Sequence, residues 1–211
     1  MSGGVAKEGV CAATPRHGRG MNRDVLVAAA PSPRARVSSW SAWRRGAFAH
    51  NPAHNRRLSA ALRKAASFEL ASWSPLRRRR LLLCAVLHDI GLAFDPDQKV
   101  MHAAAGAGLL AEVGLRDAAA VVARHAGAVV EAELRGRERE FDPWRKLPYD
   151  ADVLCVLDWI DATISPAGED VSWQQRLEDI RARYGHDSPQ ALTFEQNRAN
   201  VERGERIATA G

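Results

Sequence analysis

The sequence has few cysteines and no long apolar run, and these absences exclude several classes of protein. Its 211 residues contain three scattered cysteines, Cys11, Cys84 and Cys155, which make neither a disulfide framework nor a CxxC metal site. No apolar run approaches the ~20 residues that a helix needs to cross a bilayer, and the first residues, MSGGVAKEGV, lack the apolar core of a secretory signal. We therefore expect a cytoplasmic protein with no membrane partner, in which Cys84 and Cys155 are small buried residues.

Segments with the alternating pattern of a strand are also missing, and no internal repeat is present. From Trp40 onward, apolar residues recur at helical spacing instead. This pattern predicts an all-α bundle of about seven helices, near residues 54–73, 75–90, 102–113, 118–129, 151–165, 173–184 and 189–205. The 75–90 helix is apolar on all sides and is therefore predicted to be central. Residues 131–149 are expected to form a helix tail and an exposed loop.

Basic residues are concentrated near the N-terminus. Residues 1–48 contain eight of the 30 basic residues and two of the 25 acidic ones, so they carry +6 while the remainder sums to −1. Residues 1–38 are also rich in Gly, Pro and Ser and show no periodicity, so we expect a disordered basic leader before a helical domain at 39–207. The other basic cluster, Arg77–Arg80, heads a predicted helix and is expected to be a solvated helix end. We do not expect a nucleic-acid polymer as a partner, because the folded part lacks a basic excess.

Titratable residues interrupt the apolar stripes of five predicted helices. These residues are His54, His88, Asp89, His102, His125 and Asp161. A single histidine in such a stripe is usually a core residue with satisfied hydrogen bonds, and that interpretation stays open here. Burial of two aspartates and four histidines is costly unless each finds a partner, and a shared divalent metal would supply one for all of them.

The pattern H…HD…D on predicted helices resembles the HD-domain metal-dependent phosphohydrolase superfamily. His54 in HNRRLSAAL resembles the first histidine of that family, His88 and Asp89 in LLLCAVLHDIG resemble its HD doublet, and Asp161 in VLDWIDATISPAGE resembles its last aspartate. The resemblance extends from about Trp40 to Arg203. It implies an all-helical domain that binds divalent metal and hydrolyses phosphate compounds.

Two further histidines resemble those of the subgroups that hold a second metal ion. They are His102 in HAAAGAGLLAEVGL and His125 in VVARHAG. The resemblance implies two divalent ions bridged by Asp89, which is thus the expected catalytic residue. It implies that His54, His88 and Asp161 complete one metal site and that His102 and His125 complete the other. Fe, Mn, Mg, Ni and Zn are not distinguished.

Three positions leave alternatives open. His50 lies four residues before His54 and could replace it, although His50 precedes Pro52 and is expected to lie outside the helix. Asp158 lies three residues before Asp161 and could replace that residue. Leu92 follows HDIG where many family members have lysine; Arg124 or Lys99 could supply the missing positive charge.

The resemblance favours one function over two others. The first is hydrolysis of a phosphoester or phosphoanhydride in a nucleotide or another small phosphate compound, by water that the metals activate. The alternatives are a mixed-valence di-iron oxygenase, which uses a similar ligand set, and a non-catalytic helical binding module. The expected partner is a small-molecule phosphate substrate, and the sequence leaves a homodimer open.

Overall fold

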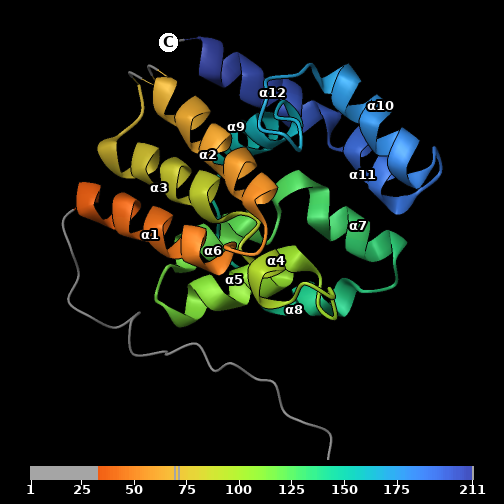
Figure 1. Ribbon diagram of the computed structural model, residues 1–211, viewed down its shortest axis with the longest axis horizontal. Helices are drawn as coiled ribbons and strands as arrows, with labels where there is room; N and C mark the ends of the chain where they lie inside the picture. Colours follow the sequence, from red (N-terminus) through yellow and green to blue (C-terminus); the bar gives the residue numbers. More distant parts are fainter. Residues whose placement is uncertain (1–32, 69, 71, 211) are drawn as a thin grey trace, which may run out of the picture.

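Helices form nearly all of the regular structure in the computed structural model, which describes residues 33–68, 70 and 72–210 (Figure 1). Within these residues the one β-type pairing is an isolated bridge between Ile164 and Asp170, so the predicted all-α class is confirmed. The helices are α1 (Pro33–Ala47), α2 (Pro52–Ser67), α3 (Pro75–Leu87), α4 (Gly91–Phe94), α5 (His102–Glu112), α6 (Arg116–Val122), α7 (Ala128–Leu134), α8 (Asp142–Arg145), α9 (Ala151–Ala162), α10 (Trp173–Tyr184), α11 (Pro189–Gln196) and α12 (Arg198–Thr209).

The N-terminal leader lies largely outside the described residues. Residues 1–32, which include Cys11, are not described. Helix α1 begins at Pro33, within the last part of the segment expected to be a leader. None of the helices in the described residues is long and apolar enough to span a bilayer.

Helix α3 is the central element, as its continuous apolar sequence predicts. Ser74 caps its N-terminus by accepting a hydrogen bond from the backbone N–H of Arg77, and Pro75 occupies the first turn, where no N–H is needed. The helix lies between α1 and α2 (Figure 1) and also packs against α6 and α9. Cys84 is fully buried in this helix and Cys155 is buried in α9, so both thiols are core residues as expected.

The basic cluster that heads α3 forms ion pairs within the protein. Arg77 contacts Asp150 at 2.7 Å and Asp152 at 3.0 Å, and Arg80 contacts Asp117 and Asp150. Asp150 is also the N-cap of α9 and accepts a hydrogen bond from the backbone N–H of Val153. These contacts join the start of α3 to the start of α9, the helix that carries Asp161.

The predicted helix at 118–129 is wrong, because the chain bends inside it. Helix α6 ends at Val122, a 3-10 turn η2 spans His125–Gly127, and α7 starts at Ala128. Ala126 and Gly127 have φ values of 52° and 73°, which an α-helix does not allow. The predicted 189–205 helix is likewise divided at Asn197 into α11 and α12. Residues 131–149 contain the end of α7, a 3-10 turn η3 (Glu138–Phe141) and α8.

Gly91 allows α4 to approach α5 closely. A Cβ atom at this position would lie 2.0 Å from the carbonyl oxygen of His102 and 2.9 Å from the backbone nitrogen of Gly106. Backbone atoms cannot move aside as a flexible side chain can, so only glycine fits here. This contact fixes the first residue of α5, His102, relative to the His88-Asp89 pair that precedes α4.

We expect Gly91→Ala to lower the free energy of unfolding by about 2–4 kcal/mol, because the added methyl group overlaps the α5 backbone. Gly108→Ala is the matched control in α5, since no heavy atom lies within 4 Å of its Cβ position. That substitution should stabilise the protein by about 0.5–1 kcal/mol through helix propensity. Urea denaturation followed by circular dichroism measures both changes, and equal stabilities of the two variants would contradict the close contact.

Candidate metal centre

The structure brings the six predicted residues together around the carboxylate of Asp89. They come from separate elements: His54 from the first turn of α2, His88 from the C-cap of α3, Asp89 from the turn before α4, His102 from the first position of α5, His125 from η2 and Asp161 from the last turn of α9. His88, Asp89 and His125 are buried, and the other three side chains are partly exposed. The six therefore share one region of the fold, and their role as metal ligands stays a prediction.

The two oxygens of Asp89 face different partners. Oδ1 lies 3.4 Å from Nε2 of His102 and 3.4 Å from Nε2 of His125. Oδ2 lies 3.2 Å from Nε2 of His54 and 3.5 Å from Nε2 of His88. One carboxylate thus separates the cluster into two halves.

Asp161 belongs to the half that contains His54 and His88. Its Oδ1 lies 3.1 Å from Nε2 of His88. His88, Asp89 and Asp161 form one group of ligand atoms close enough to hold a single ion, and Asp89, His102 and His125 form a second such group. We refer below to the His54–His88–Asp161 half and the His102–His125 half.

Local helix capping places His54 rather than His50 in the cluster. Asn51 is the N-cap of α2 and accepts a hydrogen bond from the backbone N–H of His54 at 3.0 Å, while Pro52 occupies the first turn. His54 thereby points toward Asp89. His50 precedes the cap and is exposed, so the structure favours His54 of the two candidates.

The bend before His125 orients its imidazole ring. Nδ1 of His125 lies 2.6 Å from the carbonyl oxygen of Val122. A carbonyl only accepts, so Nδ1 carries a proton, and Nε2 is the nitrogen that can offer its lone pair to the cluster once the ring is neutral. The helical break that the sequence did not reveal is therefore what aims this residue.

Asp158, the alternative to Asp161, supports the bend and is not in the cluster. Its Oδ1 accepts a hydrogen bond from the backbone N–H of Ala126 at 2.7 Å, and its Oδ2 accepts from Nδ2 of Asn197 at 3.0 Å and of Asn200 at 3.4 Å. Burial raises the pKa of Asp158 to about 6, although the hydrogen bonds from Ala126 and Asn197 act in the opposite direction. Asp158 thus links the residue after His125 to the junction of α11 and α12.

Arg57 is the member of the site that sequence reasoning missed. Its Nη1 donates to Oδ2 of Asp89 at 2.9 Å, and its Nη2 donates to Oδ1 of Asp161 at 2.6 Å. Arg57 lies three residues after His54, so both side chains leave α2 on the same face. That spacing was the available signal, because the adjacent Arg56 is only two residues after His54 and leaves the helix on another face.

The charges in this buried region shift the pKa values of its members. Burial alone would raise the pKa of Asp89, but His88, the hydrogen bond from His125 and the charge of Arg57 lower it well below its ordinary value. For Asp161, burial is likewise outweighed by Arg57 and His88, which lower the pKa. Both carboxylates are therefore ionised at neutral pH.

The two histidines near Oδ1 of Asp89 differ from each other. Burial lowers the pKa of His102 to about 4, so its imidazole is neutral. Burial also disfavours a charge on His125, but the hydrogen bond and charge of Asp89 raise the pKa of that residue to about 9. At neutral pH the metal-free protein therefore carries a proton on His125 that a metal ion must displace.

The donor set fits divalent metal ions. Imidazole nitrogens and carboxylate oxygens are common ligands of Zn, Fe and Mn, and the carboxylates are ionised. Nε2 of His54 is buried and, among the described residues, forms no hydrogen bond despite its 3.2 Å distance from Asp89. A metal ion would give this nitrogen a partner. His54, His88 and Asp161 could hold one ion with Oδ2 of Asp89, and His102 and His125 could hold another with Oδ1.

The residues considered as replacements for the missing lysine do not line the cluster. Arg124 donates to the carbonyl oxygens of Ala120, Trp144 and Arg145 and stacks on Tyr149, so it holds the segment before α9. Lys99 is exposed, and its side chain forms no ion pair with a cluster residue among the described residues.

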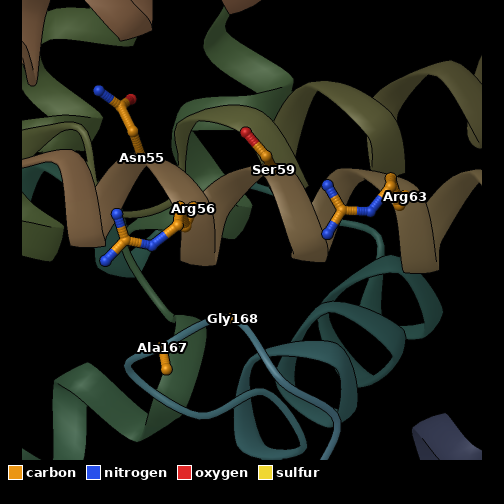
Figure 2. Close-up of a pocket in the computed structure, with 6 residues that line it drawn as sticks. All are labelled: Asn55, Arg56, Ser59, Arg63, Ala167 and Gly168. Atoms are coloured by element: carbon orange, nitrogen blue, oxygen red, sulfur yellow. The ribbon is translucent and has the colours of Figure 1, made fainter.

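A separate pocket of about 350 Å³ lies between α2 and the loop after α9. Figure 2 shows that Arg56, Ser59 and Arg63 come from successive turns of α2, while Ala167 and Gly168 come from the loop; Asn55 completes the lining. None of the six cluster residues lines this pocket. Arg56 and Arg57 therefore leave adjacent positions of α2 in different directions, one to the pocket and one to the cluster.

Comparison with protein families finds one match that bears on this site. The HD domain matches residues 54–163, just over half of the chain. This range begins at His54 and includes His88, Asp89, His102, His125 and Asp161. Searches of curated proteins and of solved structures gave no significant match.

Metal affinity should rise with pH up to about pH 9, because an ion that binds at His125 must displace a proton from a group whose folded-state pKa is about 9. Between about pH 6 and about pH 8 the affinity for Mn²⁺ should increase by up to about tenfold per pH unit. Isothermal titration calorimetry in buffers of different ionisation enthalpy should detect close to one released proton. An affinity that is constant over this range would contradict the protonation assigned to His125.

Asp158→Ala should lower the free energy of unfolding by about 2–4 kcal/mol, because the partly buried N–H of Ala126 and the amide of Asn197 lose their buried acceptor. It should also weaken Mn²⁺ binding in the His102–His125 half, since the bend that aims His125 loosens. Asp158→Asn keeps one acceptor oxygen and should fall between the two proteins in both respects. Unchanged Mn²⁺ binding in a folded Asp158→Ala protein would show that Asp158 does not position His125.

Proposed function

The chain belongs to the HD-domain family, and on this premise we propose that it is a metal-dependent phosphohydrolase that cleaves a phosphoester or phosphoanhydride bond in a nucleotide or another small phosphate compound. One observation carries the proposal: the two oxygens of a single buried carboxylate, Asp89, each face their own set of ligand atoms. This is the arrangement that two bridged divalent ions require. Asp89 would hold both ions and set the distance between them.

Divalent ions bound here would lower the pKa of water and offset the negative charge that develops on a phosphoryl group during hydrolysis. The protein contributes the positions of the ligands. Asp89 and Asp161 are kept ionised by nearby positive charge. The carbonyl of Val122 fixes the tautomer of His125, so that its Nε2 is available.

The charge balance of the cluster favours an anionic substrate. Arg57 offsets one of the two carboxylate charges in the metal-free protein. A single divalent ion therefore makes the region net positive, and a second ion adds to this. Positive potential in a partly buried site attracts and holds phosphate groups.

Arg176 of α10, which pairs with Asp179 through Nη1 at 2.6 Å, is a further positive side chain that could contact the substrate phosphate. It is largely buried, and among the described residues its Nε has no hydrogen-bond partner. Burial first, and then the charge of Arg57, lower the pKa of Arg176, while Asp161 raises it. The charges of Arg57 and Asp161 thus act on the pKa of Arg176. It could supply the positive charge that a lysine after HDIG supplies in many family members.

The proposal is tested with full-length protein stripped by EDTA and loaded with Mn²⁺ or Fe²⁺. It should release phosphate, or a phosphorylated product, from at least one compound in a broad panel of nucleotides and phosphate esters. His88→Ala and Asp89→Ala should lose both bound metal and hydrolysis while keeping a helical circular dichroism spectrum. His50→Ala is the matched control, because His50 is exposed and close in sequence to His54, and it should behave as the wild type.

Two results would overturn this function. No hydrolysis of any compound by protein that has bound its metal would favour a non-catalytic binding module. Consumption of oxygen with a coupled Fe(II)/Fe(III) signal in electron paramagnetic resonance would assign the site to a di-iron oxygenase.

A further inference from the structure

Arg57 contacts the same oxygen atoms that one half of the centre would offer to a metal ion. Its two Nη atoms contact Oδ2 of Asp89 and Oδ1 of Asp161, at 2.9 and 2.6 Å. Nε2 of His54 and Nε2 of His88 lie 3.2 and 3.5 Å from that oxygen of Asp89. A guanidinium group is therefore present where the His54–His88–Asp161 half would bind an ion.

The His102–His125 half has no such group. Oδ1 of Asp89 faces only the two imidazole rings within ion-pair distance, and no arginine or lysine of the described residues contacts it. The ring centroids of His102 and His125 are 5.3 Å apart, so both rings line the same space. The proton on His125 can be released to an incoming ion, whereas the charge of Arg57 is permanent, so the two halves share Asp89 but differ by one permanent positive charge.

We propose that Arg57 is a resident cation of the His54–His88–Asp161 half and that it sets the order in which metal ions bind. The first ion binds between Asp89, His102 and His125. A second ion binds in the other half only when Arg57 releases at least one of its two carboxylate contacts. This inference rests on the metal centre of the function proposed above and adds a residue that controls how the centre is loaded.

Electrostatic repulsion accounts for the proposed order of ion binding. A carboxylate oxygen has lone pairs for more than one partner, but a divalent ion bound to these oxygens would lie close to the guanidinium of Arg57. Like charges at such a distance repel strongly in a buried site, where water screens them poorly. In the absence of metal the same guanidinium is favourable, because it gives a permanent positive charge to two carboxylates whose other close side-chain partners are imidazoles.

The planar shape of the Arg57 guanidinium suits contact with two carboxylates at once. The planar guanidinium reaches both carboxylates with separate N–H groups, which a lysine ammonium cannot do with the same fixed geometry. The side chain is long and partly exposed at the edge of α2, since 12% of its surface is accessible. It can therefore withdraw from the cluster without unfolding the helix.

The experiment is a titration of EDTA-stripped, full-length protein with Mn²⁺ alone, followed by calorimetry and by elemental analysis after desalting. The wild type should show two classes of site, with the second at least about tenfold weaker because of the nearby charge. Arg57→Gln should tighten the second class about tenfold or more, and Arg57→Lys should give an intermediate value. The electron paramagnetic resonance spectrum of Arg57→Gln should show coupled Mn²⁺ pairs at ion concentrations where the wild type shows isolated ions.

Arg56→Gln is the matched control. Arg56 is the neighbouring arginine of α2, but it is exposed and lines the pocket of Figure 2 instead of the cluster. This variant loses the same charge from the same helix. Its Mn²⁺ titration should equal that of the wild type, which separates the effect of Arg57 from a general change of surface charge.

Thermal unfolding supplies a readout that does not depend on tight binding at room temperature. Metal-free Arg57→Gln should unfold at a lower temperature than the wild type, because Asp89 and Asp161 lose their partner. Saturating Mn²⁺ should raise its Tm by more than it raises the Tm of the wild type. If Arg57→Gln does not fold without metal, Arg57→Lys provides the same comparison with a smaller difference.

The outcomes separate this inference from the proposed hydrolysis. Equal or weaker Mn²⁺ binding by Arg57→Gln, with a Tm increase no larger than that of the wild type, would overturn the role of Arg57 alone. Absence of hydrolysis together with the expected shift in the second class would overturn the proposed reaction and support the role of Arg57. Failure of all variants and of the wild type to bind Mn²⁺ would overturn both.

Discussion

The whole site depends on how the carboxylate of Asp89 is shared. Its two oxygens point to separate groups of imidazole nitrogens, and every element around it serves to hold those groups in place. The Asn51 cap places His54, the close approach of Gly91 to α5 places His102, and the last turn of α9 places Asp161. The helical part of the chain is thus a frame that brings donors from distant sequence positions to one acidic residue.

Arg57 explains how this frame tolerates the buried carboxylate of Asp89 and the partly buried carboxylate of Asp161 without metal. Ionised carboxylates in a buried region are costly unless they are paired, and one arginine pairs both Asp89 and Asp161. Arg57 thus balances these carboxylates in the metal-free protein, while the other half of the cluster holds no arginine or lysine of the described residues. The stability of the metal-free protein and the readiness of the centre for metal are consequently opposed at a single residue.

The amino-acid sequence was sufficient to predict the all-α class, the central position of α3 and the proximity of five other titratable residues to Asp89, whose role as metal ligands stays a prediction. These succeeded because an apolar run as continuous as LLLCAVL can only be buried, and because a histidine or aspartate within such a stripe needs a partner. The break at His125–Gly127 was missed, since Ala126 has a left-handed conformation that alanine rarely adopts and only Gly127 hints at it. The role of Asp158 was missed for a related reason: its partners, Ala126 and Asn197, lie at two chain breaks that helical periodicity hides. Arg57 was missed although its three-residue spacing from His54 places both on one face of α2, because a pattern of metal ligands does not include a guanidinium, which has no lone pair to offer.

The central claim, that the cluster around Asp89 binds cations, is tested most directly by anomalous X-ray scattering from crystals grown with Mn²⁺. The account predicts an anomalous peak within ligand distance of Oδ1 of Asp89 and of the Nε2 atoms of His102 and His125. At higher Mn²⁺ concentration a second peak should appear near Oδ2 of Asp89 and Oδ1 of Asp161. Crystals that contain Mn²⁺ elsewhere in the molecule but show no peak beside Asp89 would contradict it.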